Sequence, residues 1–191
     1  MDMQALFKRL GGIKPIASDK FNPMTEAEIA SIEKERGIRL PKSYRQFLAT
    51  YGASTFNGCP PDNPFIIFHP LESLPPQFVD GTDLFDAFYG AQREEYDSFS
   101  LRVQMRFYAK YMPESLIPIG DDGGAGLICL GVKGAELGKV YYWERQNAAL
   151  DEEDYLADYG EPRPAEALFQ NVHLIAQSFE DFLQRLEIQP D

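Results

Sequence analysis

The side chains that could carry out catalysis are few in this sequence. The chain has two histidines, His69 and His173, and two cysteines, Cys59 and Cys129. A nucleophile needs a base within hydrogen-bond distance and a third group that orients the base, so the one conceivable pair is Cys129 with His173. Both lie in segments with the pattern of strands, where a buried thiol and an ordinary imidazole are the usual outcome. We therefore expect no catalytic residue and no enzyme; the competing interpretation is a hydrolase that uses this pair.

Two aspartates beside a group of glycines could in principle bind a metal ion or a phosphate. Asp121 and Asp122 offer carboxylate oxygens, but their spacing does not match the twelve-residue calcium loop, and no His/Cys cluster suits zinc. The glycines Gly123, Gly124 and Gly126 precede a strand pattern, so no helix N-terminus would face an anion. The segment is typical of a hairpin turn, and we expect neither a metal nor a cofactor.

The negative charge of the chain is unevenly distributed. The formal net charge is −12, yet residues 1–50 carry nine Lys/Arg against six Asp/Glu, a net charge of +3. Residues 144–166 carry eight acids against two bases, so this short segment alone has a net charge of −6. Such a field repels nucleic-acid phosphate and anionic lipid, and it attracts a basic partner. We expect no direct binding of nucleic acid or membrane, and a protein partner with a basic surface.

Candidate partner-binding residues come from an aromatic run and from the acids that follow it. Alternation along a strand sends Tyr141 and Trp143 to one face and Tyr142 to the other. One face must meet the helices, and the other would leave aromatic surface for a partner, although core packing is the alternative for each ring. The acids between residues 151 and 158 form either a solvated loop or a docking surface. The candidate set is Tyr142, Trp143, Glu144, Asp151, Glu152, Glu153, Asp154 and Asp158.

Four amphipathic helices are predicted around these segments. Apolar residues at helical spacing indicate the first over residues 3–10. Thr25 and Glu28 have the spacing of a capping box, which predicts a helix that ends at Gly37. Pro41 suits the first turn of the next helix, and Ser178 can cap the last one, over residues 179–186.

Short β-rich runs occupy most of the chain between the third and the last helix. They are predicted at residues 54–56, 65–68, 116–119, 126–130, 140–143 and 172–175. The pattern over residues 80–111 is helical again and predicts an inserted helical pair. Pro162 and Pro164 interrupt the acidic stretch, which we interpret as a long surface loop with one helical turn.

The bulk properties indicate one domain in the cytoplasm. A chain of 191 residues can bury a sizeable single core. No stretch approaches the roughly 18 apolar residues of a membrane span, and the first ten residues lack the apolar segment of a signal peptide. The two cysteines are far apart and are expected to be reduced thiols, Cys59 in a loop and Cys129 in a strand.

Four segments, in order, resemble the SUKH superfamily. This superfamily includes the yeast Smi/Knr cell-wall assembly regulators and many bacterial toxin-immunity proteins. The resemblance rests on the helical pair with Gly37-Ile38-x-Leu40-Pro41, on Ile117-Pro118-Ile119-Gly120-Asp121 with its glycines, on Val140-Tyr141-Tyr142-Trp143, and on Ser178-Phe179-Glu180-Asp181-Phe182-Leu183. It implies an α+β fold, with a mostly antiparallel sheet and helices packed against it, and no shared catalytic residues.

The resemblance also defines the expected organisation of the chain. A single SUKH-like domain spans residues 1–191, with its core match at 25–186, an N-terminal helix and lead-in at 1–24, and an insertion at 75–112 that has no counterpart. This chain has Gly126 and Gly131 where relatives usually have aspartates, which puts in doubt any role for acids at those positions.

The resemblance implies a protein-binding function. Many bacterial relatives neutralise a cognate toxin, often a nuclease or a deaminase, so we expect an immunity-type protein that binds such a toxin domain. The alternative is a scaffold or regulator of the cell-wall-assembly type without a toxin partner. The identity of the partner, the oligomeric state and the role of the insertion are open at this point.

Overall fold

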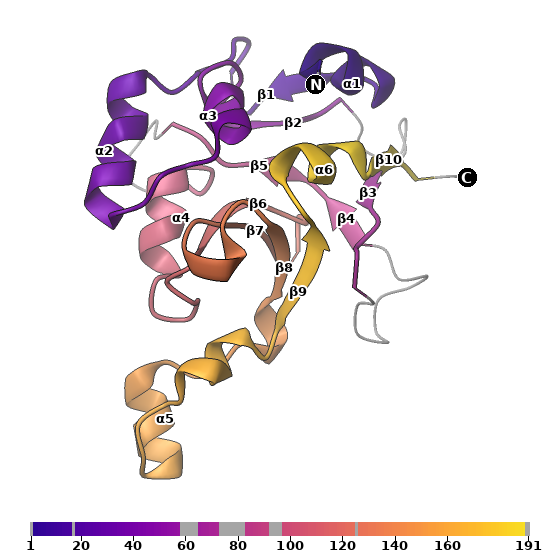
Figure 1. Cartoon of the computed structure of the whole chain (residues 1–191). Coiled ribbons are helices and arrows are strands. Elements are labelled where there is room, and N and C mark those ends of the chain that lie inside the picture. Colours follow the sequence, from indigo (N-terminus) through magenta and orange to yellow (C-terminus); the bar gives the residue numbers. More distant parts are fainter. Residues whose placement is uncertain are drawn as a thin grey trace.

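The structure is an α+β fold built on one large antiparallel sheet (Figure 1). It is a computed structural model that describes residues 2–16, 18–57, 65–72, 83–91, 97–124 and 126–189. Seven strands form the large sheet in the order β1-β2-β5-β6-β7-β8-β9, and three strands form a smaller one in the order β10-β3-β4. Every strand pairing among the described residues is antiparallel, in agreement with the mostly antiparallel sheet that the resemblance implies. Cys59 lies outside the described residues.

Five strands of the large sheet lie close to predicted segments: β2 (Ser54–Phe56), β6 (Leu116–Asp121), β7 (Gly126–Gly131), β8 (Val140–Glu144) and β9 (Val172–Ala176). The other two described strands of this sheet are β1 (Ile13–Pro15), where no strand was predicted, and β5 (Ala87–Phe88), which lies in the segment predicted as helical. The smaller sheet consists of β3 (Ile66–Phe68), β4 (Asp83–Phe85) and β10 (Leu186–Ile188). The prediction of a continuous last helix up to Leu186 is wrong, because Leu186 pairs with Phe68 and begins β10.

The helices begin and end largely where their caps predicted. They are α1 (Met3–Arg9), α2 (Glu26–Arg36), α3 (Lys42–Leu48), α4 (Leu101–Phe107), α5 (Glu152–Tyr159) and α6 (Phe179–Gln184). Short 3-10 helices are η2 (Gly134–Glu136), η3 (Arg145–Asn147) and η4 (Ala165–Phe169). The capping box of α2 is formed, since Thr25 accepts from the Glu28 amide at 3.2 Å and Glu28 accepts from the Thr25 amide at 2.7 Å. No helix in the described part of the chain is long and apolar enough to cross a membrane.

Apolar layers cover both faces of the large sheet. On one face the Trp143 ring meets the Tyr108 ring at the end of α4, with ring centroids 5.5 Å apart. On the other face Tyr142 meets Phe68 of the small sheet at 5.8 Å, and Phe68 in turn contacts Phe182 of α6 at 6.2 Å. Aromatic pairs of this kind add roughly 0.5–1.5 kcal/mol each beyond the area that they bury. The sheet is therefore a middle layer, enclosed on both sides.

The predicted helical pair over residues 80–111 is half wrong. Leu84 and Phe85 lie in β4 and Phe88 lies in β5, whereas the second helix is present as α4, with Ser100 accepting from the Val103 amide at 3.3 Å. Short apolar runs fit a helical turn and a strand equally well, and pairing with partners far away in sequence decides between them. Because β5 lies between β2 and β6, this segment completes the main sheet and is not an addition to its edge.

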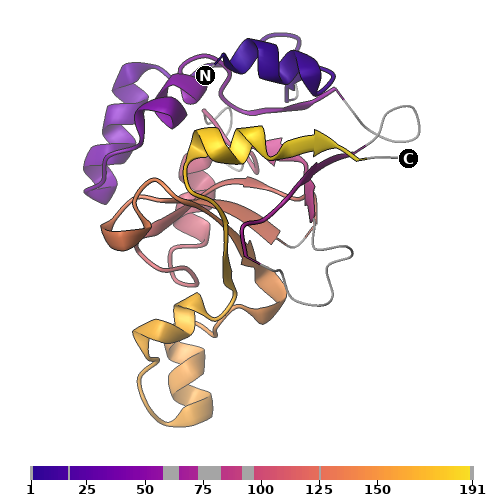
Figure 2. The same ribbon diagram turned by 45° about the vertical axis from the view of Figure 1, so that its right-hand side comes forward.

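The acidic stretch also differs from its prediction as a loop with one helical turn. It forms the helix α5, in which the Asp151 carboxylate accepts from the Asp154 amide at 3.0 Å and Gly160 ends the helix at a φ of 75°. Acids in the first turn stabilise a helix through its dipole, and Pro162 and Pro164 lie beyond its end. In Figures 1 and 2 α5 projects away from the sheet layers as an arm, which we define as residues 151–164.

The two departures from the resembled pattern have a steric explanation. A Cβ at Gly126 would overlap the buried Tyr142 ring, and one at Gly131 would overlap the backbone of Glu136. Any side chain at these two positions would have to displace packed atoms, so the close approach requires glycine.

We predict that Gly126→Ala lowers the free energy of unfolding by about 1–3 kcal/mol, because the new methyl group must displace the Tyr142 ring. Gly124→Ala is the matched control, since its Cβ would approach only Asp122, at an ordinary 3.4 Å. Urea denaturation of both variants measures the difference. Equal stability of the two variants would contradict the packing described for Tyr142.

Candidate partner-binding surface

The aromatic part of the predicted surface lies inside the protein. Tyr142 is 2% exposed and Trp143 is 1% exposed, so the core alternative holds for both rings. The expectation of an uncovered aromatic face is wrong because the small sheet and α6 cover the face that was left for a partner. Only Tyr141 is partly exposed on this strand. These rings do not form a contact surface in this fold.

Glu144 is also buried, at 5% exposed, where β8 leads toward the arm. Its carboxylate accepts from the Asn147 side chain at 2.8 Å, and its backbone oxygen accepts from the Asn171 side chain at 2.6 Å. A buried carboxylate needs such partners, because water no longer solvates its charge. Glu144 therefore connects the chain segment that leads into the arm with the segment that leads out of it.

The aspartates of the predicted hairpin are used within the turn itself. Asp122 accepts from the Gly124 amide at 2.7 Å and from the Tyr142 hydroxyl at 2.8 Å, and Asp121 accepts from the Gly123 amide at 2.9 Å. This hydrogen bonding confirms the hairpin turn between β6 and β7. The described residues contain no group of three or more His, Cys, Asp or Glu side chains placed to hold a metal ion.

The geometry separates the one conceivable nucleophile–base pair. Cys129 lies directly opposite Tyr141, and His173 lies directly opposite Tyr142. Residues opposite each other share a face of the sheet, whereas the neighbours Tyr141 and Tyr142 point to different faces, so Cys129 and His173 do as well. Burial raises the pKa of the Cys129 thiol well above its ordinary value and lowers the pKa of His173. This thiol is a core side chain whose polar contacts among the described residues are the Met112 sulfur and the Leu127 backbone oxygen.

Two of the candidate acids hold the arm to the body of the protein. Asp151 caps α5 and also accepts from the Lys110 ammonium at 2.6 Å. The hydrogen bond from the Asp154 amide, followed by the Lys110 contact, lowers the pKa of Asp151. Glu152 accepts from the Arg163 amide at 3.2 Å, and its carboxylate lies 3.7 Å from the Arg163 guanidinium.

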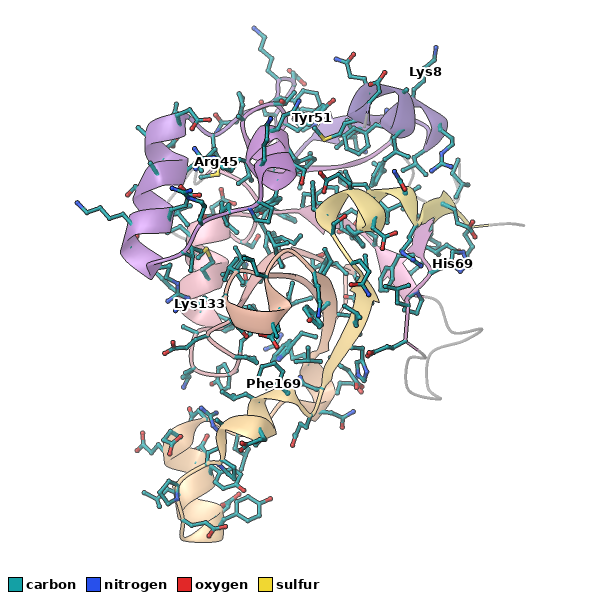
Figure 3. All side chains as sticks on the ribbon, in the orientation of Figure 1. Lys8, Arg45, Tyr51, His69, Lys133 and Phe169 are labelled. Atoms are coloured by element: carbon teal, nitrogen blue, oxygen red, sulfur yellow. The ribbon has the colours of Figure 1, made fainter. Side chains whose placement is uncertain are left out.

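Arg163 is the central side chain of this connection. It is only 10% exposed, and its guanidinium donates to the backbone oxygens of Lys110, at 3.1 Å, and Leu150. The planar guanidinium has several donors in fixed directions, so one side chain can join three segments of chain. We call Lys110, Asp151, Glu152 and Arg163 the root of the arm. Figure 3 shows the arm below the body, with Phe169 at the junction.

The other candidate acids extend into solvent without a cation. Glu153, Asp154 and Asp158 are exposed, and among the described residues no basic side chain pairs with them. The structure thus separates the eight candidates into three groups: a buried group at β8, two acids in the root, and three open acids on α5. The three acids of the last group are exposed and unpaired among the described residues, whereas Glu152 is exposed but lies beside Arg163.

Sequence reasoning missed the root and the apolar side chains of the arm. Leu156 is 50% exposed and Tyr159 is 64% exposed, although both belong to large apolar residue types. An N-cap aspartate at residue 151 followed by Gly160 was a signal for a helix here. No local pattern connects Lys110 with Arg163, because the contact joins distant parts of the chain.

Comparison with known proteins agrees with this fold. Residues 23–185 match the SMI1 / KNR4 family (SUKH-1), and the chain belongs to this family. The matched range includes residues 75–112, where the sequence motifs had found no counterpart. The chain is also similar to an SPbeta prophage-derived uncharacterized protein, YokK, of Bacillus subtilis (strain 168). The two are 26% identical over 170 residues, which cover 87% of this chain and 76% of that protein.

We predict that Arg163→Ala loosens the arm, because the backbone oxygens of Lys110 and Leu150 lose their donor and Glu152 loses its ion-pair partner. Amide hydrogen exchange over residues 152–160 should become about tenfold faster, since the opening of the arm costs less free energy. Arg39→Ala, at an exposed arginine of the body, is the control. Unchanged exchange in α5 would show that the root does not hold the arm.

Proposed function

We propose that this chain is a binding protein of the immunity type, which acts in the cytoplasm and neutralises a cognate toxin with a basic, nuclease- or deaminase-like surface. The observation that carries the proposal is the open negative charge of α5, which no basic side chain of the described residues compensates. Membership of the SUKH-1 family supports it. The separation of Cys129 from His173 favours binding over catalysis.

The charge of the arm fits the chemistry of such a partner. An enzyme that acts on nucleic acid has a cleft that attracts phosphate, and exposed carboxylates can occupy the same cleft. Three acids on one short helix concentrate this charge on a small projecting element. Complementary charge speeds the encounter of two proteins and discriminates against neutral partners.

Co-expression with the toxin-like product of the adjacent gene tests the proposal. We expect the two proteins to co-purify and the cells to survive a toxin that otherwise kills them. If the two proteins do not co-purify and the cells are not rescued, the immunity function is ruled out. A scaffold or regulator without a toxin is then favoured. A hydrolase would instead show activity that disappears in Cys129→Ala or His173→Ala, and we expect no such activity.

The open acids should control the rate of association. We predict that the triple variant Glu153→Gln, Asp154→Asn, Asp158→Asn slows association with the toxin about tenfold at low salt and flattens the salt dependence of the rate. Substitution of these three acids leaves the root intact, whereas substitution of Asp151 or Glu152 would remove contacts of the root. Stopped-flow fluorescence measures the rate.

The control for this charge experiment is Asp19→Asn with Glu136→Gln, which removes acids from the body of the protein that form no ion pair with a described base. We expect the control to associate at nearly the wild-type rate. An equal loss in both variants would assign the effect to net charge and not to the arm.

A further inference from the structure

Helix α5 has an apolar stripe whose side chains are exposed or only partly covered. Tyr155, Leu156 and Tyr159 fall within an arc of about 100° on the helix surface, the width expected of a core-facing stripe. Yet no residue of α5 is buried. Leu156 is 50% exposed and Tyr159 is 64% exposed, and the Tyr155 and Tyr159 rings contact each other at an interplanar angle of 30°, with centroids 4.5 Å apart.

Two of the open acids lie on the two sides of this stripe. By helical spacing Glu153 and Asp158 fall on opposite flanks of the stripe, Asp154 lies nearly on the far side of the helix, and Glu152 of the root lies at the N-terminal end of the stripe. The result is a narrow apolar surface with negative edges, on an element that stands away from the sheet in both views (Figures 1 and 2). Apolar side chains arranged in this way mark contact sites, because their exposure to water is unfavourable.

We propose that α5 binds as a whole, apolar stripe inward, in a groove of the toxin whose floor is apolar and whose rims carry Lys or Arg. This inference rests on the proposed function and specifies its contact. The mode is that of an amphipathic helix in a groove, where residues at i, i+1 and i+4 reach the floor and the flanks meet the rims. Leu156 and Tyr159 are the anchors, and Glu153 and Asp158 on the two flanks pair with the basic rims.

The root supports this mode of binding because it orders the arm in advance. Arg163 and Lys110 fix both ends of the segment to the body, so little conformational freedom is lost when the toxin binds. A rigid arm can enter a concave surface that a flat sheet face cannot reach. The surface of the partner should therefore be concave where it contacts α5.

Two single substitutions test the anchors. Leu156→Ala and Tyr159→Ala should each raise the Kd for the toxin-like product of the adjacent gene by about tenfold or more, mainly through faster dissociation. Leu137→Ala is the matched control, because Leu137 is 58% exposed and follows η2 on the body of the protein. We expect its Kd to equal that of the wild type in biolayer interferometry. Circular dichroism checks that each variant is folded.

The outcomes separate this inference from the function on which it rests. If the wild-type chain forms no complex with that toxin, the proposed function fails, and the inference fails with it. If the complex forms and both arm variants bind as tightly as Leu137→Ala, the inference is wrong and the function stands. A dimer of the free chain that disappears in Leu156→Ala, seen by light scattering, would show that a second copy covers the stripe, and it would also overturn the inference.

Discussion

Burial of both faces of the seven-stranded sheet is the constraint on which the rest of this structure depends. Tyr142 packs toward the small sheet and Trp143 packs toward α4, so these two aromatic side chains of β8 stabilise the fold and are not available to a partner. Burial of this kind contributes roughly 1.5–3 kcal/mol for each large side chain. The same enclosure isolates Cys129 in the core, where burial keeps its pKa high and its thiol protonated. The recognition that we propose therefore uses an element outside the layers.

The acids of the arm have two different roles. Asp151 and Glu152 bind cations of their own chain and fix the direction of α5, whereas Glu153, Asp154 and Asp158 keep their charge available. A carboxylate that is already paired contributes little to the external field, while an unpaired one steers a basic partner over a distance of about 8–10 Å at ordinary salt. Position and charge are thus supplied by different residues of one short segment.

Elements with local signals could be predicted from the sequence, and those that depend on distant contacts could not. The capping box at Thr25, the Ser178 cap and the glycine hairpin after Asp122 all act within a few residues, and each is present in the structure. Phe85 and Phe88 lack such a local signal, because only their pairing with segments far away in the sequence places them in strands. The exposed aromatic face was inferred from alternation alone, which says that a strand has two faces but not that a second sheet covers one of them.

The most direct test of this account is oxidative footprinting of tyrosines in the free chain and in its complex with the toxin. Free Tyr159 is 64% exposed and should be oxidised rapidly, whereas Tyr44 is fully buried and serves as an internal reference. The account predicts that complex formation protects Tyr155 and Tyr159 strongly and leaves the oxidation of Tyr44 unchanged. Equal oxidation of Tyr159 in the free and bound chain, with protection elsewhere on the body, would contradict it.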